Sequence, residues 1–79
     1  MNQIQAFRDT ILLAEQNGMP EDIGSPFGLA HVRDMYQQAC DGNFSEAKLG
    51  RWLGWAQCAV AAAGVCDLYT MKIINKMWS

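Results

Sequence analysis

Apolar residues recur along the chain at the three- and four-residue steps that place them on one face of an α-helix. Gly18 and Pro20 end the first such run, and Ser25 followed by Pro26 is typical of the start of the next. No segment alternates apolar and polar residues as a β-strand does, so we expect one all-α domain, a compact bundle of three to four short helices. The predicted helices cover about residues 2–17, 26–40, 46–63 and 67–77.

Residues between the predicted helices indicate how each helix begins or ends. Ser45 and Asp67 are expected to cap the third and fourth helices with their side-chain oxygens. Gly42 is expected to take the left-handed conformation that ends the second helix, and Gly64 closes the third.

The third predicted helix contains two glycines four residues apart. Gly50 and Gly54 each destabilise a helix by up to about 1 kcal/mol relative to alanine, so we expect them to permit close approach of another helix. They form a stripe of small residues with Cys58, and Trp52 beside the stripe is assigned to the core and to the same packing or oligomer interface. Two partners remain open for this surface: a helix of the same chain, or a helix of a second subunit in a homo-oligomer.

The charge of the chain is nearly balanced but unevenly distributed. Six Lys and Arg against eight Asp and Glu give a net charge of −2, which argues against a protein held on DNA or RNA mainly by phosphate contacts. Residues 1–41 carry two cations and six carboxylates, a net of −4, whereas residues 42–79 carry four and two, a net of +2. The two halves can complement each other within the fold or between subunits, unless both are ordinary solvated helix faces.

The basic half places Lys48, Arg51 and Trp55 along one strip of the third helix, at steps of three and four residues. Trp and Arg dominate the energetics of protein interfaces, and an Arg beside an indole can also stack a base and hold a phosphate. We therefore predict a binding site at these three residues, extended by Lys72 and Trp78 of the last helix. In the alternative interpretation, Lys48 and Arg51 merely flank a partly buried Trp55.

Residues suited to catalysis or metal binding form no motif. His31 is the only histidine, with Asp34 three residues later, and Cys40, Cys58 and Cys66 match no zinc-site or nucleophile spacing. We expect no enzyme, no metal and no cofactor, and we interpret Cys58 and Cys66 as reduced core residues. The polar start of the sequence and the shortness of its apolar runs predict a cytoplasmic protein with no membrane partner.

The segment from Phe44 to Gly64 resembles small proteins encoded by tailed phages and prophages, in which a helix carries the motif R-W-L-G-x-x-Q. The resemblance covers about residues 30–77 and is strongest over 44–64. It implies an accessory protein that modulates the host by binding: it blocks a defence complex, occupies a host enzyme or sequesters a nucleotide signal. The matching residues are Arg51, Trp52, Leu53, Gly54 and Gln57.

These observations support three hypotheses about function. The first is non-catalytic contact with a host protein, in host takeover or defence inhibition, by a chain that is itself a homo-oligomer. The second is an oligomeric sponge that sequesters a small nucleotide between subunits. The third is a DNA-binding regulator, against which the net charge of −2 and the scarcity of base-reading side chains on the third helix both count.

Overall fold

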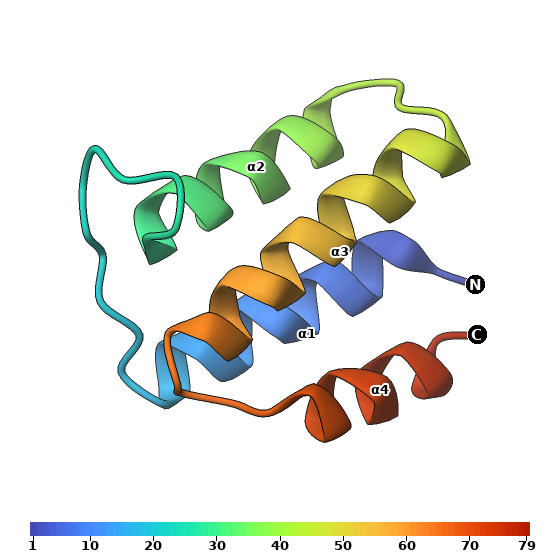
Figure 1. Ribbon diagram of the computed structural model, residues 1–79. Coiled ribbons are helices and arrows are strands. Elements are labelled where there is room, and N and C mark those ends of the chain that lie inside the picture. The colour runs from blue at the N-terminus through green and yellow to red at the C-terminus, as the bar shows by residue number, and fades with distance from the viewer.

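The computed structural model describes residues 1–79 and contains only helices, which confirms the predicted all-α class (Figure 1). All four helices were predicted, and three of them begin and end within one residue of the expected bounds. The helices are α1 (Gln3–Gln16), α2 (Leu29–Asp41), α3 (Glu46–Ala62) and α4 (Leu68–Met77).

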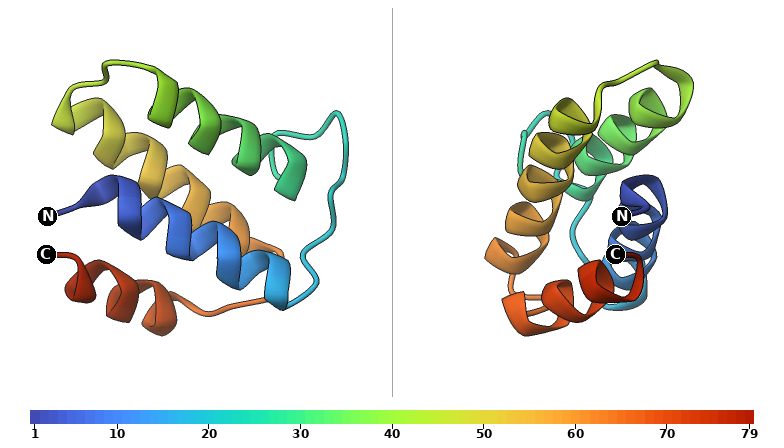
Figure 2. Two further views of the ribbon diagram at one scale, coloured as in Figure 1. Left: turned by 180° about the vertical axis from the view of Figure 1, so that it is seen from behind. Right: turned by 90° about the vertical axis from the view of Figure 1, so that its right-hand side faces the viewer.

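Helices α1 and α3 form the centre of the bundle, because each of them packs against all three other helices. Helices α2 and α4 lie on opposite sides of α1 and do not contact each other (Figure 2). The largest fully buried side chains, Phe7, Thr10, Val32 and Val60, come from α1, α2 and α3. Met71 and Ile74 of α4 join the same core. No helix of the chain has the length and apolar character needed to cross a membrane.

Side-chain caps fix the starts of three helices. The Ser45 hydroxyl accepts a hydrogen bond from the Lys48 main-chain N–H, and the Asp67 carboxylate accepts one from that of Thr70, as predicted. Asn2 caps α1 in the same way, because its side chain accepts from the Gln5 N–H. These caps satisfy N–H groups that have no partner inside the helix.

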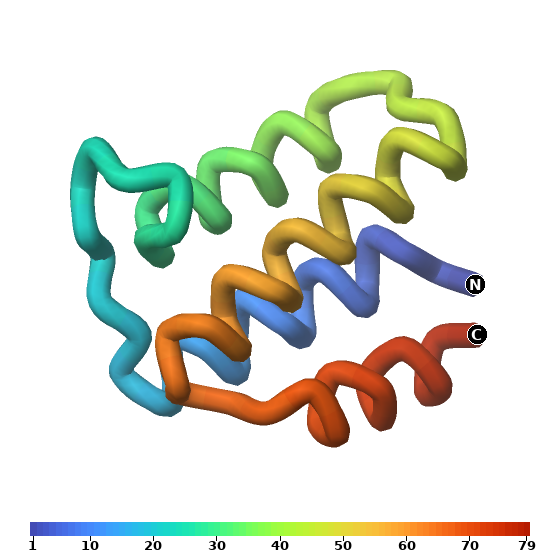
Figure 3. The backbone as a smooth tube through the Cα atoms, viewed as in Figure 1, coloured from blue at the N-terminus to red at the C-terminus, as the bar shows by residue number.

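Helix α2 begins at Leu29, three residues later than predicted, because the preceding loop crosses its first turn (Figure 3). The Pro20 and Glu21 carbonyl oxygens accept hydrogen bonds from the main-chain N–H groups of Leu29 and Ala30, at 2.9 and 3.1 Å. A Cβ on Gly28 would lie 2.2 Å from the Glu21 oxygen, so only glycine fits under the crossing. Main-chain carbonyls thus replace the predicted cap by Ser25.

A glycine follows α1, α2 and α3, but only two of these glycines take the left-handed conformation. Gly18 and Gly64 follow α1 and α3 with φ of +74° and +76°, where glycine has no steric penalty. The prediction of a left-handed Gly42 is wrong, because this residue is extended, with φ of −90° and ψ of 166°.

The two ends of the chain are joined by a main-chain hydrogen bond. The Asn2 N–H donates to the Trp78 carbonyl oxygen at 2.6 Å, so the start of α1 and the end of α4 lie side by side (Figures 1 and 2).

Candidate functional site

The outward face of α3 carries almost no charge, and no other helix covers it. This face points toward the viewer in Figure 1, where α3 lies in front of α1. Arg51 is its only charged residue and makes no ion pair within the chain. A face with a single charged residue has a low desolvation cost when another molecule packs on it. Its exposed residues are Ala47, Gly50, Arg51, Gly54, Trp55, Cys58 and Ala62.

Packing inside the chain does not explain Gly54, and at Gly50 it involves only one side chain. A Cβ on Gly54 would meet no atom within 4 Å, and a Cβ on Gly50 would meet only the flexible Gln3 side chain, at 3.0 Å. The interpretation that a helix of the same chain packs closely on this stripe is therefore wrong at Gly54, and Cys58 is exposed as well. A second molecule remains open as the partner.

The two tryptophans of α3 have different surroundings. Trp52 is half-buried, and its ring centroid lies 4.8 Å from that of Phe44 in an edge-on contact. Trp55 is 38% exposed, and its ring lies 5.1 Å from that of Phe27, which is 53% exposed. The Trp55 indole N–H donates to the Pro26 carbonyl oxygen at 3.4 Å. Phe27 and Trp55 thus form an aromatic edge to the α3 face.

The predicted strip of Lys48, Arg51 and Trp55 is only partly available to a partner. The Lys48 ammonium lies 4.0 Å from the centre of the Phe44 ring and 5.3 Å from that of Trp52, which are cation–π distances. Lys48 therefore contributes to packing inside the chain, whereas Arg51 and Trp55 remain exposed on the α3 face.

Of the two site residues predicted for the last helix, Lys72 lies on α4 and Trp78 directly follows that helix as its C-cap. Lys72 is exposed and unpaired. Trp78 packs against the core, and its indole N–H donates to Asp9 Oδ2 at 2.6 Å. This bond joins the end of the chain to α1, so the Trp78 indole N–H already has a partner within the fold.

The glutamine of the R-W-L-G-x-x-Q motif has a structural role that the sequence reasoning missed. Gln57 is buried, and its amide exchanges two hydrogen bonds with the Asn75 amide, at 2.8 and 3.0 Å. Gln57 Nε2 also lies 3.3 Å from Thr10 Oγ1, and Thr10 donates to the Ala6 carbonyl. This network ties α3 to α4 and α1, and its partners are too distant in sequence for any local pattern to indicate them.

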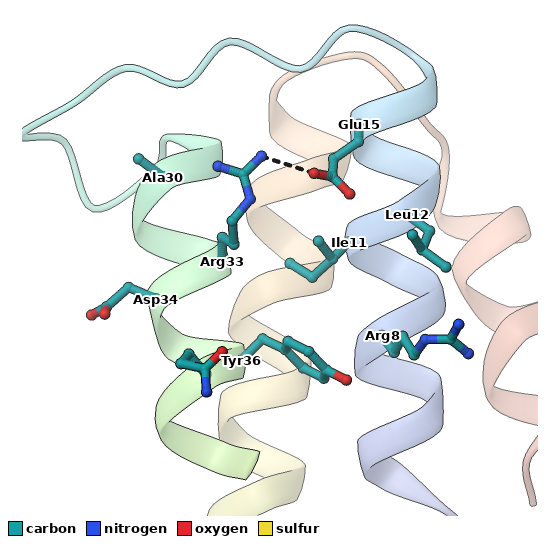
Figure 4. A pocket seen from close by; sticks show the side chains of 9 residues that line it. Arg8, Ile11, Leu12, Glu15, Ala30, Arg33, Asp34 and Tyr36 are labelled. Atoms are coloured by element: carbon teal, nitrogen blue, oxygen red, sulfur yellow. Dashed lines mark hydrogen bonds and ion pairs between the residues drawn. The ribbon is translucent and has the colours of Figure 1, made fainter. Parts of the chain in front are cut away.

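An open groove of about 530 Å³ between α1 and α2 was not predicted either (Figure 4). It lies on the side of the bundle opposite the α3 face, since α3 passes behind it in the close view. Ile11, Leu12, Ala30 and Tyr36 supply its apolar lining. Burial raises the pKa of the Tyr36 hydroxyl, and the neighbouring Cys40 thiol raises it further.

One end of the groove is held by a guanidinium between two carboxylates. Arg33 Nη2 lies 3.0 Å from Glu15 Oε2, and Arg33 Nη1 lies 2.8 Å from Glu21 Oε1. The hydrogen bonds hold the pKa of Glu21 below its ordinary value and raise that of Arg33. The three side chains join α1, the crossing loop and α2.

The cysteines are free thiols, and two of them lie on the surface. Cys40 and Cys58 are exposed and Cys66 is half-buried, so the prediction that Cys58 belongs to the core is wrong. The His, Cys, Asp and Glu side chains nowhere gather in a group of three that could hold a metal ion.

Comparisons of the chain with protein-family models, with curated proteins and with solved structures give no match.

Proposed function

We propose that this chain is a small phage-type accessory protein that acts without catalysis, by binding a host protein in the cytoplasm of the infected cell. The outward face of α3 is its contact surface, with Arg51 and Trp55 as the central contacts. The chain acts as a homo-oligomer, so each assembly presents several copies of this face.

The observation that supports this proposal is Gly54. A glycine inside a helix costs about 1 kcal/mol relative to alanine, and nothing in the chain occupies the space that its missing side chain leaves. Close approach of a second molecule would account for that cost. The exposed Phe27–Trp55 pair at the edge of the face and the unpaired Arg51 are of the residue types that dominate binding energy at protein interfaces.

A size variant tests the proposal without disturbing the fold. Gly54→Leu fills the open space above α3 and improves helix propensity, so the variant should fold at least as well as the parent protein. Affinity purification from host cells should recover a defined partner with the parent protein and lose it with Gly54→Leu and Arg51→Ala. Gln16→Ala, at an exposed position of α1 outside both the α3 face and the groove, is the matched control. Recovery of the same partner by Gly54→Leu at undiminished yield would contradict the proposal.

Sequestration of a nucleotide signal is a second candidate. It is supported by Arg51 and Trp55, which lie four residues apart on α3 and are both exposed. A thermal-shift panel of linear and cyclic nucleotides tests it, because a bound ligand raises the melting temperature with the logarithm of its concentration. An unchanged melting temperature across the panel would remove this candidate.

A further inference from the structure

The outward face of α3 carries a single charge, and this charge lies near the middle of the face. At about 3.6 residues per turn, Arg51 projects between Gly54 and Trp55, with only small residues otherwise around it. The one carboxylate of α3, Glu46, lies in the first turn and projects from another side of the helix. The Arg51 guanidinium makes no ion pair in the chain, so a molecule that covers the face must supply an acceptor for it.

Two largely apolar hollows border the C-terminal end of the same face. The first, of about 360 Å³, lies beside the aromatic edge, between Phe27 and the last turn of α3. The second, of about 740 Å³, lies between the last turn of α3 and the turn into α4, and Leu68 borders it. Ala62 lines both hollows, so one small side chain separates them. Together with the open space above Gly54, the hollows offer places for large apolar side chains of a second molecule.

The segment that covers this face must satisfy its own main-chain hydrogen bonds. Within α3 the main-chain N–H and C=O groups bond to each other, so the face has no free edge with which an extended strand could pair. A strand or loop laid on the face would bury unpaired N–H and C=O groups, which is costly. A helix bonds its main chain internally and presents only side chains, so it is the element that this face accepts at the lowest cost.

A second copy of this chain has no helix of the required character. Helix α4 exposes large apolar residues but contains no carboxylate, and α2 exposes Asp34 and Asp41 but no large apolar residue. On α1, Glu15 already belongs to an ion pair. On α3, Glu46 lies more than two turns from the exposed Trp55. A partner helix with a free carboxylate among large apolar side chains therefore belongs to another protein.

We propose that the host segment bound by α3 is an amphipathic helix that places one Asp or Glu opposite Arg51, among large apolar side chains. Its carboxylate accepts two parallel hydrogen bonds from the guanidinium. Its apolar side chains fill the space above Gly54 and the two hollows at the end of α3. Arg51 and Ala62 are about 16 Å apart along the helix axis, so the contact extends over about three turns of the partner. This assignment rests on the proposed function and names the kind of partner that its contact surface fits.

Hydrogen exchange on the captured host protein, measured free and in the complex, locates the bound segment. The segment whose amide exchange slows on binding should be a helix of about three turns. It should have large apolar residues on one face and an Asp or Glu among them. Slowed exchange in a strand or an irregular segment would overturn the assignment.

Charge exchange tests the pairing with Arg51. Arg51→Glu should weaken binding about a hundredfold, because two carboxylates then face each other, and Arg51→Lys about tenfold, because an ammonium cannot form the paired hydrogen bonds. Replacing the host carboxylate with Lys should restore binding to Arg51→Glu and not to the parent. Lys72→Glu is the matched control, since it makes the same change in net charge at an exposed, unpaired residue of α4. Circular dichroism of each variant should match that of the parent.

The outcomes distinguish this assignment from the proposed function. Loss of capture in Gly54→Leu with full binding by Arg51→Glu would overturn the assignment and leave α3 as the contact surface. Equal losses in Arg51→Glu and Lys72→Glu would also overturn it, because the effect would then follow net charge alone. A parent protein that recovers no host partner would overturn both.

Discussion

The start of α2 and the outward face of α3 each depend on a glycine, but in opposite ways. At Gly28 a loop crosses the helix, and a Cβ would strike main-chain oxygens of Glu21 and Asp22 at 2.2 and 2.6 Å. At Gly54 a Cβ would meet nothing within 4 Å. The fold itself requires Gly28, whereas nothing in the fold requires Gly54. The difference shows that only one of these two glycines is explained by packing within the fold.

Alanine at Gly28 should have the largest effect on stability. The new Cβ overlaps main-chain atoms that cannot rotate away, so the crossing must move, and we expect a loss of about 2–3 kcal/mol in the free energy of unfolding. Urea denaturation followed by circular dichroism measures it. A variant as stable as the parent would mean that the crossing is not needed to hold the start of α2.

Replacing Gln57 tests the inner side of the helix that bears Gly54. Gln57→Leu leaves the Asn75 amide without its two partners, which should cost about 1–3 kcal/mol in the same assay. The double variant with Asn75→Leu should recover part of that loss, because no buried amide then lacks a partner. A double variant that simply adds the two losses would show that the amide pair contributes no coupling.

Trp78 and Trp55 allow a similar comparison, because the indole N–H of each donates one hydrogen bond, within the fold for Trp78 and at the exposed edge of the α3 face for Trp55. Trp78→Phe removes a bond of 2.6 Å to the Asp9 carboxylate and should destabilise the fold by about 1.5 kcal/mol. Trp55→Phe removes only a 3.4 Å bond at an exposed edge, so it should change stability by less than Trp78→Phe. Thermal unfolding of the two variants side by side checks the order, and the reverse order would contradict our distinction between them.

Alanine at Gly54 should stabilise the protein by up to about 1 kcal/mol, because it improves helix propensity and meets no neighbour. Gly50→Ala should gain less, since its Cβ would press on the Gln3 side chain at 3.0 Å. Denaturation midpoints give both values. A destabilised Gly54→Ala would mean that the glycine has a role inside the chain.

The acid sensitivity of the loop clamp should be the smallest effect. Arg33 holds the pKa of Glu21 below its ordinary value of 4.5 in the folded state. The clamp therefore stabilises the fold fully above pH 4.5 and ceases to do so as the pH falls through the lowered pKa. Glu21→Gln should flatten the pH dependence of stability in this acid range and leave it unchanged near neutrality. If the stability of the variant fell just as steeply at acid pH, the loss would belong to other carboxylates.

Local signals predicted most of the fold. The spacing of apolar residues located the helices, and Ser45 and Asp67 located the starts of two of them. Both signals involve only residues within one or two helical turns of each other. The start of α2 was misplaced because it depends on the Pro20 and Glu21 carbonyls, which fold back over Leu29 and Ala30. Ser25 and Pro26, a good local start signal, could not reveal this crossing.

The sequence predicted only those parts of the candidate site that depend on neighbouring residues. Arg51 and Trp55 lie on one exposed face of α3, as their four-residue spacing in a helix predicted. Trp78 was assigned to binding because nothing in the sequence links it to Asp9, 69 residues away. The groove between α1 and α2 depends equally on tertiary placement, which brings Glu15 to Arg33 across 18 residues.

The hydrogen bond between Asn2 and Trp78 gives the fold an almost circular backbone. A short peptide linker could join the two ends with little strain, and the chain could be opened instead in the exposed part of the crossing loop, between Ile23 and Gly24. Cyclisation would restrict the unfolded chain far more than the folded one, so it should raise stability without adding any contact to the native structure. Tags fused at either end would emerge side by side at one edge of the bundle.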